Sequence, residues 1–226
     1  MIASPGRRIL AEFLGGALLT AVVVGSGIAA QHLSPADIGL QLLENALATA
    51  LGLVVLILVF GPVSGAHLNP VVSLVDALLG HRPWGDLIGY LPAQIVGCSA
   101  GAVLANLMFG EPAVGLSTTD RASWPHLLAE VVATAGLVLV IFGLARTGRG
   151  ALAAPAVGAY IGAAYFFTSS TSFANPAIAI GRMFSDTFAG IAPSSVAPYI
   201  AAELVGGALG WLVVRVLFPV TAGPKP

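Results

Sequence analysis

Two short stretches, Ser64-Gly-Ala-His-Leu-Asn-Pro70 and Ser172-Phe-Ala-Asn-Pro-Ala177, decide the fold of this chain. Each places an Asn-Pro pair after small residues, in an apolar segment (67–79 or 175–184) that is too short to cross a bilayer. Asparagine is a preferred helix N-cap and proline a preferred first helical residue. We therefore expect two half-helices after irregular backbone, which survives in a membrane only when protein buries it or it lines a wet cavity.

The composition is that of a membrane protein. Of 226 residues, 57% are hydrophobic and 8% are charged, and the mean hydropathy is +0.95, whereas soluble domains carry about 25% charged residues. This excludes a soluble enzyme, a nucleic-acid-binding protein and a disordered protein. Apolar blocks long enough to span a bilayer lie at 9–30, 40–60, 87–109, 126–145, 152–168 and 196–218. The sequence thus predicts an all-α membrane protein with six transmembrane helices and two re-entrant half-helices.

The distribution of basic residues predicts the orientation, because cytoplasmic loops carry an excess of Lys and Arg. We expect both termini to be cytoplasmic and the chain to be a multi-pass protein of a bacterial inner membrane. Two arginines, Arg121 and Arg182, then lie outside. The cytoplasmic side holds Arg7, Arg8, Arg82, Arg146, Arg149, Arg215 and Lys225.

The chain reads as a duplicated unit. Ala11-Glu12 opens the first span as Ala129-Glu130 opens the fourth, and Tyr90-Leu-Pro-Ala-Gln-Ile-Val-Gly97 matches Tyr199-Ile-Ala-Ala-Glu-Leu-Val-Gly206. Each half has three crossings, so the second half must be inverted relative to the first. We expect one transmembrane channel domain over 1–226 with inverted repeats at about 9–109 and 126–218. Inverted repeats with broken helices that meet near the midplane mark a solute pathway.

The paired Asn-Pro motifs, together with Glu12 and Glu130, strongly resemble the aquaporin or major intrinsic protein family, and the resemblance extends to about Phe218. It implies a passive channel for small neutral solutes, a homotetramer with one pore per subunit, and neither a cofactor nor a metal. A coupled secondary transporter, which also uses inverted repeats and broken helices, is an alternative. An intramembrane enzyme is not expected, because no metal-ligand spacing and no Ser–His pair falls near the midplane.

The resemblance places the central constriction where the two half-helices meet end to end. Two positive helix N-termini at the midplane would repel cations and interrupt proton transfer. The side-chain amides of Asn69 and Asn175 would donate hydrogen bonds to the solute, unless both asparagines serve only as caps. Val71 replaces the alanine usual in the family. The residues of this constriction are Asn69, Pro70, Val71, Asn175, Pro176 and Ala177.

The resemblance also assigns a selectivity filter, by counting from the two asparagines, to Thr49, Ala163, Ser172 and Ile178. Water-selective relatives carry an arginine where Ile178 stands. Because the four side chains here are small or aliphatic, we expect a wider and less basic constriction. It would pass water, glycerol-like polyols and trivalent metalloid hydroxides such as arsenite. A water-selective aquaporin is the alternative.

Two further segments bear on the solute. In glycerol channels an aspartate stands where this chain has Ala179. Ile178 and the run Asp186-Thr-Phe-Ala-Gly-Ile191 resemble a bacterial arsenic-associated, aquaglyceroporin-like subgroup that lacks the filter arginine. Arg182 lies one helical turn after Ile178, on the same helix face. It either points with Phe173 into an outer vestibule or pairs with Asp186.

Three acids lie in apolar spans, where ionisable groups are costly and suggest function. Glu12 and Glu130 either relay protons in an active transporter or act as structural carboxylates that accept N–H groups of the irregular loops. The resemblance favours the structural role. Glu203 occupies the place of Gln94 in the repeat, so a charge is not required there, and packing between spans is expected.

Overall fold

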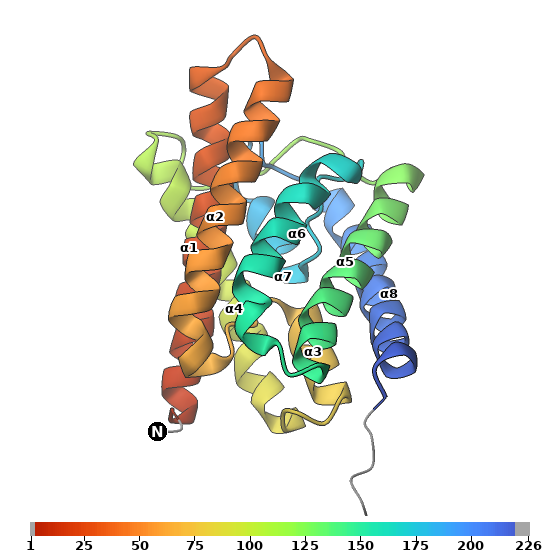
Figure 1. Ribbon diagram of the computed structural model, residues 1–226. Coiled ribbons are helices and arrows are strands. Elements are labelled where there is room, and N and C mark those ends of the chain that lie inside the picture. The colour runs from red at the N-terminus through yellow and green to blue at the C-terminus, as the bar shows by residue number, and fades with distance from the viewer. Residues whose placement is uncertain (1–2, 220–226) are drawn as a thin grey trace, which may run out of the picture.

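The computed structural model describes residues 3–219, which are helical and contain no strand (Figure 1). The predicted all-α fold with six apolar helices and two short half-helices is confirmed. The long helices are α1 (Pro5–Leu33), α2 (Ile38–Ser64), α4 (Leu87–Met108), α5 (Trp124–Arg146), α6 (Ala153–Phe167) and α8 (Pro193–Leu217). The half-helices are α3 (Pro70–Leu78) and α7 (Pro176–Arg182), and the 3-10 turns η1 (Trp84–Asp86) and η2 (Gly150–Leu152) lead into α4 and α6. Lys225 and both ends of the expected 1–226 domain lie outside the described residues.

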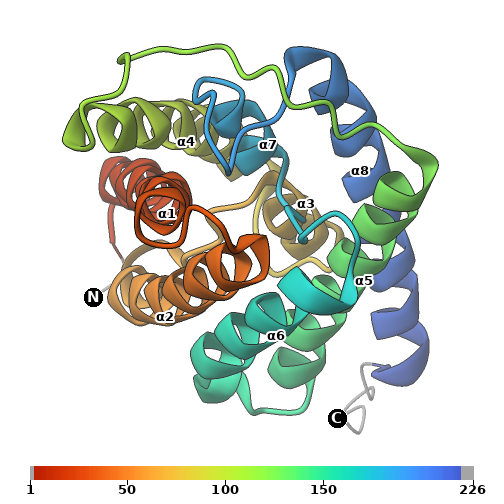
Figure 2. The same ribbon diagram turned by 90° about the horizontal axis from the view of Figure 1, so that it is seen from above.

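The two half-helices lie at opposite ends of the bundle. We call the end at which α1 begins and α8 ends the terminal end, and the opposite one the distal end (Figure 1). Helix α3 lies toward the terminal end and α7 toward the distal end. Seen along the bundle, the long helices surround α3, and α7 lies between α4 and α8 (Figure 2). Each half-helix packs against both α4 and α8, so each half of the chain encloses the half-helix of the other.

Glycines allow the tightest helix contacts, between α1 and α4 and between α5 and α8. A Cβ at Gly97 or Gly101 of α4 would collide with backbone carbonyl oxygens of α1. Gly206 and Gly210 of α8 face the backbone of α5 in the same way. Small residues at such crossings let membrane helices pack through van der Waals contact, since lipid offers no hydrophobic driving force between them. These glycines hold the same positions in the two repeated stretches.

The α1–α4 contact yields a prediction on stability. Gly101→Ala should lower the thermal unfolding midpoint of the purified protein, because its Cβ meets the Ala17 carbonyl and overpacking typically costs about 1–3 kcal/mol. Gly61→Ala is the matched control, since nothing lies within 4 Å of a Cβ at Gly61. Equal midpoints for the two variants would contradict this account of the helix crossing.

Candidate solute pathway

The two half-helices meet at their N-termini through the asparagines that cap them. Asn69 Oδ1 accepts from the Val71 amide at 2.9 Å, and Asn175 Oδ1 accepts from the Ala177 amide at 3.0 Å. Each side-chain nitrogen reaches the opposite loop. Asn69 Nδ2 donates to the Ala174 carbonyl at 2.7 Å, and Asn175 Nδ2 donates to the Leu68 carbonyl at 2.8 Å. An amide nitrogen has two donors, so each asparagine can cap its helix, brace the junction and still offer one N–H to a solute.

The first loop before this junction is held by a buried carboxylate. Ala66 and Leu68 have positive φ angles of 47° and 51°, a strained conformation for residues with a side chain. Glu12, which is fully buried, accepts from the amides of His67 at 3.0 Å and Leu68 at 2.7 Å. It also accepts from Ser64 Oγ at 2.6 Å and, as the fourth donor, from Nε2 of Gln94 at 2.7 Å. This is the geometry of a structural carboxylate.

The second loop repeats this arrangement with one change. Ser172 and Ala174 have positive φ angles of 53° and 49°. Glu130 is fully buried and accepts from the amides of Phe173 at 2.9 Å and Ala174 at 2.7 Å. The next amide along the loop, that of Asn175, donates to Glu203 at 3.0 Å. Glu203 therefore contacts the loop directly, beyond the packing role that its sequence position suggested.

A cavity runs past the junction, and both halves of the chain contribute to its wall. Asn69 and Asn175 lie on this wall, as do three of the four residues assigned to the filter, Thr49, Ser172 and Ile178. A second cavity adjoins it toward the terminal end. The residues that line both cavities are Ile57, Ala66, His67, Val72, Ile141 and Val157. The two cavities together form a candidate pathway along the bundle.

The position assigned to α6 needs a correction. Val157, Ile161 and Tyr165 line the cavity, whereas Ala163 is exposed on the outside of the bundle. Each helical residue turns the direction of the side chain by about 100°, so Ala163 points away from the face that carries Ile161 and Tyr165. The Tyr165 hydroxyl is hydrogen-bonded to Thr49 Oγ1 at 3.1 Å. An aromatic ring thus lines this level, which was expected to carry only small side chains.

Four residues assigned to the central constriction lie behind the cavity wall. Pro70, Val71, Pro176 and Ala177 are buried and do not line either cavity. A Cβ at Gly207 of α8 would collide with the Val71 side chain. The added bulk of valine is therefore accommodated against α8, away from the pathway.

Arg182 lies in the distal part of the cavity wall. It is 3% exposed, and its guanidinium carbon lies 3.5 Å from the ring centroid of Phe173, which also lines the cavity. Its Nε donates to the Ala189 carbonyl. The alternative pairing with Asp186 is not present. Asp186 instead accepts from the backbone amide and the hydroxyl of Thr118, at 2.9 and 3.2 Å.

A second distal arginine, Arg121, was assigned no role from the sequence. It donates to the carbonyls of Gly190 at 2.7 Å and Phe188 at 3.0 Å, and it lies 5.5 Å from the Phe173 ring centroid. Burial lowers the pKa of Arg121 from its ordinary value. Within residues 3–219 neither Arg121 nor Arg182 has an ion-pair partner. Arg182 therefore brings an unpaired positive charge to the distal part of the cavity wall. No sequence motif marks Arg121, because its partners are backbone carbonyls.

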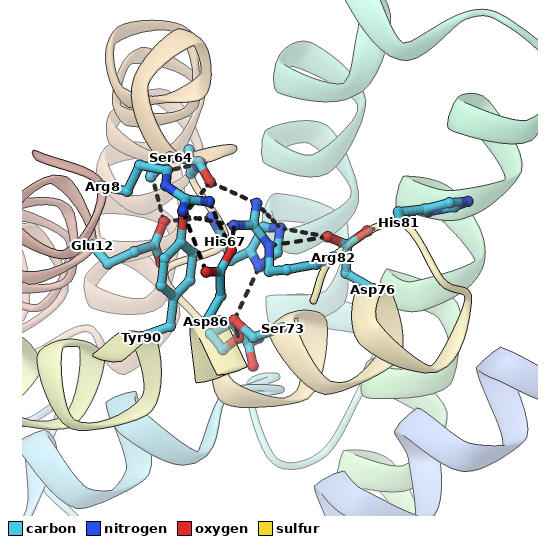
Figure 3. A network of polar contacts seen from close by, with 12 residues as sticks. Arg8, Glu12, Ser64, His67, Ser73, Asp76, His81, Arg82, Asp86 and Tyr90 are labelled. Atoms are coloured by element: carbon cyan, nitrogen blue, oxygen red, sulfur yellow. Dashed lines mark hydrogen bonds and ion pairs between the residues drawn. The ribbon is translucent and has the colours of Figure 1, made fainter. Parts of the chain in front are cut away.

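A polar network lies at the terminal end (Figure 3). Arg82 donates to the Ser64 carbonyl at 2.9 Å and to the Tyr90 hydroxyl at 2.8 Å, and it pairs with Asp76 at 3.2 Å. Asp76 also faces His67 Nε2 at 3.3 Å, at the edge of the second cavity. Arg82 therefore fixes the start of the first loop. Arg82 lies in the loop between α3 and η1, so no helical spacing in the sequence marks its contacts.

A bundle of apolar helices with two half-helices that meet end to end beside an internal pathway defines a class of protein, the α-helical membrane channel. The family model described as "Major intrinsic protein" matches residues 3–174. The chain belongs to this family and is a multi-pass membrane protein.

Several relatives are similar over nearly the whole chain. The aquaglyceroporin AqpS of Rhizobium meliloti (strain 1021) is 47% identical over 209 residues, which is 92% of this chain and 89% of the relative. Aquaporin NIP1-1 of Zea mays is 32% identical over 219 residues, 92% of this chain and 75% of the relative. The X-ray structure of the aquaglyceroporin from Plasmodium falciparum has the same fold, with a TM-score of 0.75 and 20% identity over 96% of this chain and 98% of that one.

The loop carboxylate yields a second prediction. Glu12→Leu should lower the yield of folded protein and its thermal midpoint, because two loop amides lose their acceptor and each unsatisfied buried group costs about 1–3 kcal/mol. Glu44→Leu is the control, since within the described part of the chain Glu44 accepts a single hydrogen bond, from Ser34 Oγ at 2.9 Å, at the distal end. Similar losses in both variants would argue against a special role for Glu12.

Proposed function

We propose that this protein is a passive channel for water and small neutral solutes of the glycerol class. The observation that carries this proposal is the asparagine junction on the wall of an internal pathway. The printed name of the Rhizobium meliloti relative, an aquaglyceroporin, supports it. Solutes would pass by exchanging water for hydrogen bonds with Asn69 and Asn175.

The electrostatics of the pathway favour neutral solutes. Each half-helix begins at the junction, and a helix N-terminus carries roughly half a positive charge. Arg182 adds a positive charge on the distal side. The cavity wall between Arg182 and the asparagine junction is largely apolar. Cations and protons would therefore be disfavoured along the pathway, whereas a hydroxyl oxygen can accept hydrogen bonds from the amides.

The choice among neutral solutes would be made at the distal constriction, the narrow part of the pathway on its distal side. We infer that Thr49, Tyr165, Ser172 and Ile178 form the narrow part of the filter, with Phe173 and Arg182 one helical turn farther out. An aliphatic Ile178 leaves room for a solute larger than water. Trivalent arsenic and antimony hydroxides are neutral and resemble glycerol in size and in hydrogen-bonding groups, so arsenite is a candidate solute.

A water-selective channel is the second candidate. It is favoured by the buried Arg182, which lies against Phe173, and by the Tyr165 ring, because together they restore an arginine and aromatic groups near the filter level. A coupled transporter is less favoured. Glu12 and Glu130 bind the loop backbone and line neither cavity.

The assembly and the orientation complete the proposal. We propose a single channel domain with inverted repeats at about 9–109 and 126–218, both termini in the cytoplasm and a location in a bacterial inner membrane. The terminal end would then face the cytoplasm. Many large apolar side chains of α2 are exposed, including Leu47, Leu51 and Leu58. They would contact lipid or neighbouring subunits of a homotetramer.

Stopped-flow light scattering of proteoliposomes tests the proposal. Water, glycerol and arsenite should all enter faster than in protein-free liposomes, in proportion to their gradients and without an effect of ionophores. Ile178→Arg should remove glycerol and arsenite entry while water flux persists, because a bulky cation then occupies the narrow level. Ala163→Leu, on the outside of α6, is the control and should behave as the wild type. Fast water flux without glycerol or arsenite entry would instead establish the water-selective alternative.

Arg182 provides a separate prediction. Arg182→Ala should raise glycerol flux by up to about tenfold, equivalent to ~1.4 kcal/mol of barrier, because the distal constriction loses its largest side chain. Arg215→Ala is the control, since Arg215 stacks on Trp211 at 5.1 Å near the end of α8. Unchanged water and glycerol fluxes in Arg182→Ala, at equal amounts of folded protein, would show that Arg182 does not limit the pathway.

A further inference from the structure

Two carboxyl groups, those of Glu130 and Glu203, meet behind the second half-helix. They bind three successive loop amides: Glu130 takes those of Phe173 and Ala174, and Glu203 takes that of Asn175. Successive Cα atoms lie only about 3.8 Å apart, so carboxyl groups bound to adjacent amides are neighbours. Both are fully buried.

The corresponding place in the first half holds an amide. Gln94 stands in α4 where Glu203 stands in α8, and its Nε2 donates to Glu12 Oε2 at 2.7 Å. The carboxylate of the first half thus receives a proton donor from its neighbour. In the second half the neighbour is an acid, and Oε2 of Glu203 has no hydrogen-bond partner among the described residues.

Two ionised carboxylates in this position would be unstable. Like charges on neighbouring buried groups repel strongly, because little solvent screens them, and both carboxylates would lack water. Arg182 stacks on Phe173 and donates to a backbone carbonyl. No ion pair joins it to either glutamate within residues 3–219. A single proton between the two carboxyl groups removes the repulsion and gives the partnerless oxygen a role.

We propose that Glu130 and Glu203 share one proton, and that Glu203 acts as a neutral donor that positions the second loop as Gln94 positions the first. One negative charge then stands behind each half-helix, that of Glu12 behind α3 and that of the pair behind α7. The positive N-terminus of each half-helix would then face one negative charge of equal size. The consequence for cation exclusion rests on the proposed channel function, whereas the shared proton does not.

Infrared spectroscopy of the purified protein at neutral pH tests the shared proton directly. The wild type should show the carbonyl stretch of a protonated carboxylic acid, and Glu203→Gln should lose it. Glu203→Gln should keep the thermal midpoint of the wild type, because an amide also donates to Glu130 and still accepts from the Asn175 amide. Glu203→Leu, which can do neither, should lower the midpoint. Glu44→Gln is the matched control and should keep the band.

A wild type without the band, or a band that survives Glu203→Gln, would overturn the proposal. So would a Glu203→Gln midpoint as low as that of Glu203→Leu. Solute flux in proteoliposomes tests the proposed channel function separately from the shared proton. If wild-type liposomes pass neither water nor glycerol while the infrared result holds, the channel function fails and the shared proton stands.

Discussion

Irregular backbone inside a membrane must find hydrogen-bond acceptors within the protein, and the rest of this structure depends on how two loops meet that requirement. The loop before each half-helix is strained and offers consecutive amides to a buried carboxylate, Glu12 in one half and Glu130 in the other. The carboxylates hold the loops in place, and the loops place the asparagines. A charge that would be costly in lipid is thereby stabilised by the donors it satisfies.

The junction ties the two halves together. Because Asn69 and Asn175 each donate to the carbonyl of the opposite loop, neither half-helix is positioned by its own half alone. Glycines at the α1–α4 and α5–α8 crossings bring the flanking helices close enough to support the loops. The duplicated architecture is not exact, since one half pairs a carboxylate with the amide of Gln94 and the other pairs two acids.

The pathway that results differs along its length. Its distal part holds the cation Arg182 against the Phe173 ring, and its middle is largely apolar apart from the asparagines. Its terminal part is bordered by the network in which Arg82 and Asp76 fix the first loop. In the proposed channel, a neutral solute with hydroxyl groups would meet hydrogen-bond donors in the distal part and at the asparagine junction, and a largely apolar wall between them.

The sequence by itself determined the membrane class, the spans and both half-helices, because length, hydropathy and helix-capping chemistry are local properties. For Glu12 it left two roles open, and only the family resemblance favoured the structural one. Only the tertiary structure decided which side chains line the pathway. Ala163 and Tyr165 are two residues apart, yet the rotation of α6 turns one outward and the other inward. Arg182 could equally have paired with Asp186, and its place against Phe173 depends on the backbone carbonyl of Ala189, a partner that residue spacing does not reveal. Such choices depend on helix rotation and on backbone partners, which residue spacing does not encode.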